Sequence, residues 1–310
     1  YIIIYIMISR IHPESQYLFL IKNIINNGVT QKGRNGNIKT LIGSSMRFPL
    51  INNQIPLVTT KKLAWKSCLK ELLWFINGET DNSILQNQNV KIWNGNSSRE
   101  FLDSRELYHY EENDLGPIYG YQWRHFNKRY TTKKKHNRDK KIAKFIGKSK
   151  NDIDQLQNII DSLQNPKDIN SRRLIMTAWN PCQLKQMALP PCHVMSQFHV
   201  LDNKLSCTMY QRSGDVGLGI PFNIASYSFL TILLAHHCGL EPGEFIHFIG
   251  NAHIYEEHED ALLEQIKREP YNFPKCYINK KYNNIDYYKV KDFVIKDYKF
   301  HEKIKMEMKA

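Results

Sequence analysis

Apolar residues follow two different spacings along the chain, which predicts both helices and strands. A first helix is predicted to end in a glycine cap at Gly28, and a second covers Trp65–Ile76 and is ended by Gly78. The apolar residues of the first helix recur at helical spacing and are Tyr17, Leu20, Ile21, Ile24 and Ile25.

Segments with the alternation typical of strands lie in the second half of the chain. Residues 194–200 and 205–210 flank a polar turn at residues 202–204, which predicts a β-hairpin. Residues 173–179 are expected as a further strand. Residues 224–238 are apolar nearly all round, so we expect a helix buried in the interior. Intermingled strands and helices predict an α+β fold.

Composition narrows the class of protein without choosing a function. In a chain of 310 residues, 42% hydrophobic and 24% charged residues are ordinary for a globular protein. The apolar opening, residues 1–8, is shorter than the roughly 20 residues that a membrane helix needs, so we expect no membrane span and no targeting signal. Because the chain begins with Tyr1 and not with Met, it is interpreted as a fragment or a processed protein.

Cysteine usage and net charge indicate a reducing setting and an anionic partner. Six cysteines without a CxxC pair argue against a disulfide scaffold and a zinc site, so we expect a cytoplasmic protein without a metal. The formal charge of +13 favours a phosphate-bearing small molecule or nucleic acid. Residues 128–150 are strongly basic and are expected to form a disordered or loose surface insertion, with nucleic-acid binding as the alternative.

Cys192 is the first candidate for chemistry. Pro190 and Pro191 fix the backbone before it, and a predicted strand begins after it, so the thiol has a rigid mount. A nucleophilic thiolate needs positive charge or a dipole to lower the thiol pKa from roughly 8.5. Taken alone, a cysteine is more often a small buried hydrophobe. A Cys–His hydrolase using His193 is disfavoured, because neighbours in a strand face apart.

The segment after the hairpin carries groups that suit an oxyanion. Arg212 and Ser213 offer donors to phosphate oxygens, and Gly214 lets the backbone approach closely. Arg212 is also expected to stabilise the candidate thiolate. In the plainer interpretation, Asp215 and the neighbouring glycines are only turn chemistry.

Two polar residues, Asn223 and Glu71, lie at the start of or within predicted apolar helices and are candidates for function. Asn223 is either the N-cap of the buried helix or a reader of a uracil edge, because an amide offers both an acceptor and donors. Glu71 lies on an apolar helical face, where desolvation would raise its pKa towards the range useful for proton transfer. Its plainer role is a pair with Lys70 or contact with water.

Two further pairs are candidates for binding. Arg172 and Arg173 are expected at the start of a strand, where neighbours point to opposite faces, so one site could hardly use both. His253 and Tyr255 are two apart and share a face if extended, where both could bond a sugar hydroxyl. Ordinary solvated or core roles are the alternative for each pair.

In their order along the chain, these segments resemble the thymidylate synthase family over nearly the whole sequence. The stretches that carry the resemblance are Phe48-Pro49, residues 57–62 (LVTTKK), 71–75 (ELLWF), 115–120 (LGPIYG), 122–124 (QWR), 171–173 (SRR), 178–180 (AWN), 191–193 (PCH), 211–215 (QRSGD), 221–227 (PFNIASY) and 253–255 (HIY).

The resemblance implies a single domain, residues 1–310, with a mixed twisted β-sheet covered by helices and a sheet that packs at a two-fold dimer interface. It implies that Cys192 attacks C6 of deoxyuridine monophosphate (dUMP), so that C5 captures the methylene of 5,10-methylenetetrahydrofolate. Hydride from the folate then completes thymidylate and leaves dihydrofolate. The protein orients the partners and supplies charge.

Individual roles are also implied by the resemblance. Phosphate would be held by Arg34, Arg212 and Ser213 of one subunit and by Arg172 and Arg173 of the other, which answers the objection about neighbouring arginines. The implied catalytic residues are Cys192, Glu71, Tyr119, His193, Arg212 and Asp215. Gly214, Asp215, Asn223, His253 and Tyr255 would complete the substrate site. The implied folate wall is Ile92, Trp93, Asp215, Leu218, Gly219 and Phe222.

Departures from the family and rival functions stay open. Asn251 stands where the family often has Asp, and the tail, residues 304–310, ends differently from a segment that serves as a lid in the family. A deoxycytidylate hydroxymethylase of the same fold is the nearest rival, against which Asn223 argues. A basic nucleic-acid-binding protein with a vestigial site is the rival from another class, and nucleic-acid binding is expected to be secondary.

Overall fold

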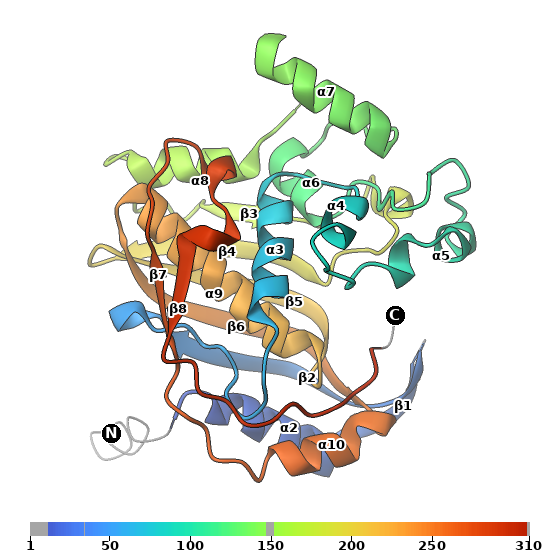
Figure 1. The fold of residues 1–310 in the computed structure, drawn as a ribbon, viewed down its shortest axis with the longest axis vertical. Helices are drawn as coiled ribbons and strands as arrows, with labels where there is room; N and C mark the ends of the chain where they lie inside the picture. Colours follow the sequence, from blue (N-terminus) through green and yellow to red (C-terminus); the bar gives the residue numbers. More distant parts are fainter. Residues whose placement is uncertain (1–11, 34, 147–151, 309–310) are drawn as a thin grey trace. The chain divides into compact units, whose positions relative to one another are not determined.

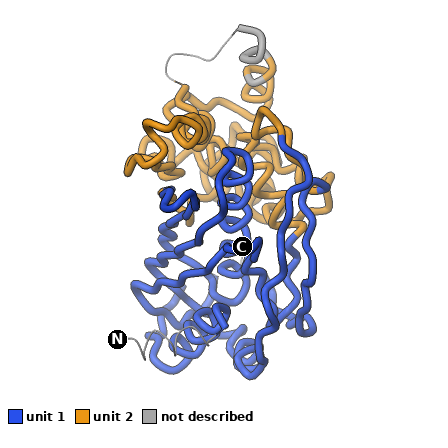
Figure 2. Tube along the Cα trace, turned by 90° about the vertical axis from the view of Figure 1, so that its left-hand side faces the viewer, with its two compact units in different colours: residues 1–65, 198–281, 291–309 blue, residues 66–197, 282–290, 310 orange. Residues whose placement is uncertain are grey.

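The computed structural model describes residues 12–33, 35–146 and 152–308, without the side chains of Lys140 and of residues 142–146. The chain falls into two compact units (Figure 2): unit 1 is residues 1–65, 198–281 and 291–309, and unit 2 is residues 66–197, 282–290 and 310. That both belong to a single domain stays a prediction. The expectations for residues 1–8 lie outside the described residues.

Helices and strands intermingle along the chain, which confirms the α+β class. The helices are α2 (Ser15–Asn27), α3 (Trp65–Ile76), α4 (Ser83–Gln86), α5 (Arg99–Ser104), α6 (Tyr119–His125), α7 (Lys133–Ile146), α8 (Gln155–Gln164), α9 (Gly219–Cys238) and α10 (Glu259–Gln265). The strands are β1 (Val29–Gly33), β2 (Gly36–Pro49), β3 (Ile175–Thr177), β4 (His193–Leu201), β5 (Lys204–Asp215), β6 (Glu241–Tyr255), β7 (Lys275–Ile278) and β8 (Phe293–Lys296).

Six of these strands form one sheet in the order β1-β2-β6-β5-β4-β3, and β7 pairs with β8 separately. The sheet is mixed, as the resemblance implied, because β5 and β6 are parallel whereas β1–β2, β2–β6 and β3–β4 are antiparallel. The chain leaves β5 through α9 and returns as β6, the crossover that a parallel pair requires. The ends of β5 and β6 that carry candidate residues are therefore neighbours.

Helix α9 packs along β5 and β6 in unit 1 (Figure 1). Tyr227 of α9 stacks on Phe245 of β6, with ring centroids 5.9 Å apart. By length and composition alone α9 could cross a membrane. Most of its residues are nevertheless buried within the protein, as predicted for a core helix.

The start of α9 differs from the prediction. The helix begins at Gly219, before Ile224, and Leu218 is an N-cap without a side-chain hydrogen bond. Pro221 lies in the first turn, where a helix requires no donor from it. Asn223 therefore lies inside the helix, and its expected role as the N-cap is wrong. Treating Gly219 and Pro221 as turn residues caused the error.

Helix α2 ends at Gly28 as predicted, but not through a left-handed cap. Gly28 has φ −68° and ψ 146°, an extended conformation, and its N–H bonds the carbonyl of Ile24 at 2.8 Å. A Cβ at Gly28 would lie 2.4 Å from that carbonyl oxygen. The helix end therefore requires glycine at position 28 because a side chain would clash there, and not because φ is positive. Helix α3 matches its prediction.

The predicted hairpin is formed by β4 and β5, with a shorter turn than expected. Asp202 and Asn203 have φ of 49° and 60°, as a two-residue type I′ turn requires. Lys204 is already the first residue of β5, and β5 continues past Tyr210 to Asp215.

The strand expected over residues 173–179 is reduced to β3, Ile175–Thr177. Arg172 and Arg173 lie in a turn before it, where the N–H of Arg173 bonds the Ser171 hydroxyl at 3.2 Å. The prediction that the two arginines begin a strand is wrong, and with it the argument that they point to opposite strand faces. Both are exposed.

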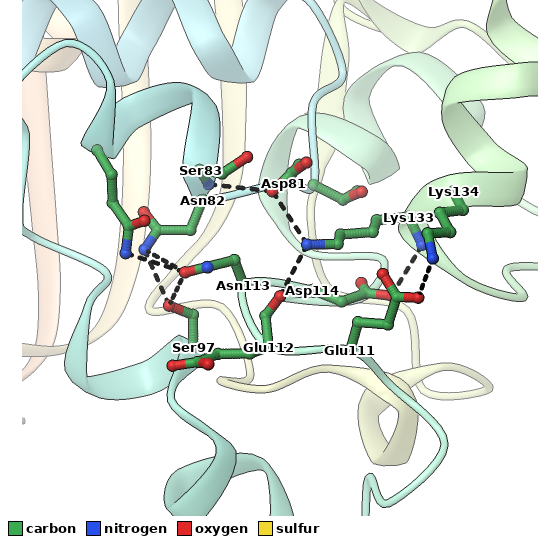
Figure 3. A network of polar contacts seen from close by, with 12 residues as sticks. Asp81, Asn82, Ser83, Ser97, Glu111, Glu112, Asn113, Asp114, Lys133 and Lys134 are labelled. Carbon is green, nitrogen blue, oxygen red and sulfur yellow. Dashed lines mark hydrogen bonds and ion pairs between the residues drawn. The ribbon is translucent and has the colours of Figure 1, made fainter.

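The basic insertion contains a helix, so its expectation as a disordered or loose loop is wrong for α7; residues 147–151 lie outside the described residues. Figure 3 shows how acidic groups of unit 2 hold the first turn of α7. The N–H of Lys133 donates to the Asp114 carboxylate at 2.8 Å, and Lys133 Nζ donates to the Glu112 carbonyl at 2.7 Å. His136 is buried with a ring nitrogen 2.9 Å from the Gly78 carbonyl oxygen.

Candidate active site

Cys192 stands immediately before β4 in unit 2, as predicted from the strand pattern that follows it. Its N–H donates to the hydroxyl oxygen of Tyr119 at 2.7 Å, and the residue is half-buried. Tyr119 is the first residue of α6, and its ring centroid lies 4.9 Å from that of Phe75 on α3. The main chain of the candidate nucleophile is therefore hydrogen-bonded to a tyrosine that is buried among aromatic side chains.

His193 lies next to the same tyrosine. It is buried at the first position of β4, and its ring centroid is 5.1 Å from that of Tyr119. The structure thus brings Cys192, Tyr119 and His193, three predicted site residues, together around the side chain of Tyr119 in unit 2.

Glu71 and Trp93 form the second cluster of unit 2. The indole N–H of Trp93 donates to the Glu71 carboxylate at 2.7 Å. Burial raises the pKa of Glu71 to about 7, and the hydrogen bond from Trp93 opposes that rise. Lys70 bonds the Gln88 carbonyl instead, so the expected raised pKa is supported and the plainer Glu71–Lys70 pair is not formed.

In unit 1, Asn223 is held by a residue that the sequence analysis did not single out. Gln211 Nε2 donates to Asn223 Oδ1 at 2.9 Å and to the Ser213 carbonyl, and Gln211 Oε1 lies 2.8 Å from His247 Nε2. An amide oxygen only accepts, so His247 Nε2 carries the proton and fixes the orientation of Gln211. The amide of Asn223 is oriented in turn.

The parallel register of β5 and β6 places the predicted phosphate and sugar residues side by side. Ser213 is opposite Asn251, and Asp215 is opposite His253. Arg212 is half-exposed beside them. His253 and Tyr255 share a face as predicted, with ring centroids 5.6 Å apart.

Asn251 gives His253 a defined tautomer. His253 Nδ1 lies 3.1 Å from Asn251 Oδ1, so Nδ1 donates and Nε2 is left to accept. Burial lowers the pKa of His253, while the nearby Asp215 carboxylate and a hydrogen bond to the Asn251 backbone oppose that shift. A neutral ring with an accepting Nε2 suits a sugar hydroxyl. Asn251, which stands where the family often has Asp, therefore affects the structure by orienting the His253 ring.

The loop after β5 explains two further predictions. Asp215 Oδ1 accepts the N–H of Gly217 at 2.8 Å, which is the turn chemistry of the plainer interpretation. At Gly214 a Cβ would lie 2.4 Å from Ile220 Cδ1. Packing therefore accounts for Gly214 without a ligand. Leu218, Gly219 and Phe222 of the predicted folate wall are half-exposed.

Two residues that the sequence analysis did not assign to the site hold this loop by hydrogen bonds to its carbonyls. The Tyr17 hydroxyl donates to the Val216 carbonyl at 2.9 Å, and Lys61 Nζ donates to the Gly217 carbonyl. Burial lowers the pKa of Lys61 to about 8, against the opposing effect of Asp215 and Glu14. Both donors are far from the loop in sequence, so no local pattern predicts them.

The remaining predicted residues are not joined to these clusters. Arg34 lies outside the described residues. Arg172 and Arg173 are exposed in unit 2, and Ile92, next to Trp93, is half-exposed there. The predicted proximity of Cys192 to Arg212 and Asn223 joins residues of different units and stays a prediction. No group of three or more potential metal ligands occurs among the residues that the structure describes.

Comparison with known proteins shows the family of the chain. The thymidylate synthase family model matches residues 15–310. The chain belongs to the thymidylate synthase family. It is 47% identical to "Thymidylate synthase 1/2" of Encephalitozoon cuniculi, over 96% of this chain and 98% of that protein.

Longer family members are similar as well. The chain is 49% identical to the "Bifunctional dihydrofolate reductase-thymidylate synthase" of Plasmodium chabaudi, over 96% of this chain and 49% of that protein. It is 48% identical to the "Putative bifunctional dihydrofolate reductase-thymidylate synthase" of Oryza sativa, over 97% of this chain and 58% of that protein. The chain thus spans about half the length of several curated relatives.

Proposed function

We propose that this protein is a thymidylate synthase, which converts dUMP into thymidylate with 5,10-methylenetetrahydrofolate as the one-carbon and hydride donor. The thiolate of Cys192 would add to C6 of the pyrimidine, and Arg212 and Ser213 would hold the phosphate. Tyr119 would keep the nucleophile in place through its bond to the Cys192 N–H. Glu71, with a pKa raised to about 7, is suited to proton exchange near neutral pH.

The orientation of Asn223 is the observation that carries this proposal. Because Gln211 donates to Asn223 Oδ1, the amide nitrogen of Asn223 is free to donate to O4 of uracil, while Oδ1 has a second lone pair for N3–H. Cytosine presents an acceptor at N3 and a donor at C4, and a fixed amide cannot turn over to match it. The mismatch leaves buried groups unpaired, at a cost of roughly 1–3 kcal/mol. This argues against the deoxycytidylate hydroxymethylase.

The residues near α9 fit a reduced folate. Leu218 and Phe222 offer half-exposed apolar surface beside the Asp215 carboxylate, and that carboxylate can accept an N–H of the pterin ring. The folate would supply the methylene group and the hydride. The protein's share is to hold the pterin against the nucleotide and keep water away.

A spectrophotometric assay tests the proposal. The protein is mixed with dUMP and methylenetetrahydrofolate, and the absorbance of dihydrofolate is followed, with deoxycytidine monophosphate in a parallel arm. We expect turnover with dUMP alone, loss of turnover in Cys192→Ser, and retained dUMP binding by that variant. Cys182→Ser, a change at an exposed cysteine of the same unit, is the matched control. Full turnover in Cys192→Ser would overturn the assignment of the nucleophile.

We further propose a homodimer in which Arg172 and Arg173 complete the partner's phosphate site. Tyr210 and Phe248 face each other across β5 and β6 and are 43% and 44% exposed. They stand on the sheet face opposite Phe245, which packs on α9. Exposed aromatic pairs on a sheet favour burial against a second copy.

Subunit mixing tests the shared site. A Cys192→Ser protomer and an Arg172→Ala/Arg173→Ala protomer should each be inactive, and a mixture should regain about a quarter of the activity, because half of the dimers carry one intact site. A mixture of exchanging subunits without activity would contradict the sharing of arginines between protomers.

Nucleic-acid binding is a secondary proposal, supported by the exposed Lys134, Lys135, Arg138 and Lys141 on α7. Binding of this kind should weaken steeply as salt rises and should be lost when residues 133–150 are removed. We also propose that both units form one domain and that the protein works in the cytoplasm, for which six thiols in a large chain argue. A fluorescent fusion imaged in cells would test the location.

A further inference from the structure

His258 lies where three parts of unit 1 meet. It ends the short 3-10 turn Glu256–His258 after β6 and is 1% exposed. Its Nε2 is 2.8 Å from the carbonyl oxygen of Glu307, in the C-terminal segment. Its Nδ1 is 3.9 Å from Asp215 Oδ1, and its ring centroid lies 5.6 Å from that of Tyr255. One buried side chain thus contacts the tail, the loop after β5 and a predicted sugar-binding residue.

The hydrogen bond to the tail has a defined direction. A carbonyl oxygen only accepts, so His258 Nε2 carries the proton and donates to Glu307. The distance from Nδ1 to Asp215 is too long for a hydrogen bond, and Nδ1 has no hydrogen-bond partner among the described residues. The ring therefore bonds the tail through one nitrogen and places the other next to the carboxylate.

The tail meets the loop at Gly217. A Cβ at this position would lie 3.1 Å from His258 Nδ1, 3.2 Å from Asp215 Oδ1 and 3.3 Å from Met306 Sδ. The histidine, the carboxylate and the methionine therefore converge on the α-carbon of Gly217. Met306 therefore lies against the segment between Asp215 and Leu218.

The loop itself is fixed from the other side. Tyr17 and Lys61 donate to the consecutive carbonyls of Val216 and Gly217, and the N–H of Val216 bonds the His253 carbonyl at 2.8 Å. In contrast, the tail around Met306 has no regular secondary structure, and Lys305 and Glu307 are exposed. Of the two parts that meet at Gly217, the tail is the one free to move.

We propose that His258 is a positioning residue, which holds the C-terminal segment over the Asp215–Gly217 loop through the Glu307 carbonyl. This inference rests on the proposed function, since that loop is assigned to the folate. The bond fixes the tail in the arrangement that covers the folate, so its loss weakens folate binding more than nucleotide binding.

Two substitutions separate positioning from a structural role. His258→Ala removes the donor, and we expect the Michaelis constant for methylenetetrahydrofolate to rise about tenfold, the effect of one lost hydrogen bond, with the dissociation constant for dUMP unchanged. His258→Gln retains an N–H donor and should stay within about threefold of the parent protein. His236→Ala removes a ring that also lies 2.8 Å from a carbonyl, that of Lys280, and serves as the matched control.

A second readout does not depend on activity. Trypsin cleaves after Lys303 and Lys305, and mass spectrometry measures how fast the tail is lost from the folded protein. Cleavage should be faster in His258→Ala and unchanged in His258→Gln and His236→Ala. If His258→Ala does not fold, Met306→Ala at the half-exposed tail replaces it and should show the same faster cleavage.

The outcomes distinguish this inference from the proposed function. A parent protein that forms no dihydrofolate would contradict the proposed function, whereas the cleavage rates would still report on His258. An active parent whose His258→Ala variant keeps its folate constant and its tail protection would overturn the inference. So would a His258→Gln variant as impaired as His258→Ala.

Discussion

Trp93 donates its indole N–H to the carboxylate of Glu71 across 2.7 Å, although the two residues lie on different elements of unit 2. The bond stabilises the ionised carboxylate, while burial destabilises it, and burial has the larger effect because the pKa of Glu71 is raised to about 7. A carboxyl group near its pKa at neutral pH can both donate and accept a proton. This poised state has consequences for stability as well as for catalysis.

The first prediction concerns stability and pH in Glu71→Gln. The pKa of Glu71 is about 7 in the folded protein and 4.5 in its ordinary environment. Between these values the unfolded chain loses a proton that the folded protein keeps, so the parent protein loses stability as pH rises through this window. Glutamine does not titrate. The melting temperature of Glu71→Gln, relative to the parent, should therefore be higher at pH 8 than at pH 5.

Glu100→Gln is the control for this measurement, because Glu100 is exposed in the first turn of α5. Its melting temperature relative to the parent should not follow the same trend. If the difference between Glu71→Gln and the parent were the same at both pH values, Glu71 would not have a raised pKa.

The second prediction concerns the mount of the nucleophile. Tyr119→Phe removes the acceptor of the Cys192 N–H, and an unsatisfied donor costs about 1–3 kcal/mol. We expect kcat to fall by roughly 10-fold to 100-fold, which corresponds to that energy, while dUMP binding is retained. Tyr110→Phe is the matched control, because the Tyr110 hydroxyl also bonds the main chain, at the Gln186 carbonyl. Equal kcat values in the two variants would contradict a role for the Tyr119 hydroxyl.

The sequence predicted helices and strands well where the residues of the segment itself determine its conformation. The helix Trp65–Ile76 and the hairpin follow from periodicity and turn residues within each segment. The predictions failed where the same residue types are common in two different kinds of local structure. Gly219 and Pro221 can belong to a turn or to a first helical turn, and the packing of α9 against β5 and β6 decides between them. Residues 133–146 were interpreted from their charge alone, so the buried His136, which anchors α7 to the Gly78 carbonyl, was overlooked.

The sequence predicted candidate site residues, but not the residues that hold those side chains in place. Cys192, Glu71 and Asn223 stand in recognisable segments, whereas Gln211 matters through its bond to a residue on α9. His258 bonds a carbonyl 49 positions away in the chain. Contacts of such long range depend on the packing of β5, β6 and the tail, and no sequence spacing encodes them.

The third prediction concerns the choice of base. Gln211→Met keeps the volume of the side chain but removes the donor to Asn223 Oδ1, so the amide of Asn223 can turn over. The affinity for dUMP relative to that for deoxycytidine monophosphate, measured by competition binding, should fall by about tenfold, as expected for one lost hydrogen bond. Gln157→Met, at an exposed bond to Asp161 on α8, is the control. An unchanged ratio in Gln211→Met would show that Gln211 does not orient Asn223.

The last prediction concerns the anchor of the basic helix. Lys133 donates its N–H to Asp114, and its side chain donates to the Glu112 carbonyl and lies 3.4 Å from Asp81 (Figure 3). Lys134 pairs with Glu111 at 2.5 Å, but the two side chains are 76% and 47% exposed. Exposed ion pairs contribute about 0–1 kcal/mol, whereas the Lys133 and Asp81 side chains are only 13% and 15% exposed, so solvent screens their contact less.

Hydrogen exchange should therefore separate these neighbouring lysines. In Lys133→Ala the amides of α7 should exchange several-fold faster than in the parent, because a helix of fewer than about 15 residues is marginal without tertiary contacts. In Lys134→Ala the same amides should exchange at the parental rate. If both variants exchanged alike, the side-chain contacts of Lys133 would not be what holds α7 on unit 2, and its helical conformation would have to come from the remaining anchor at His136.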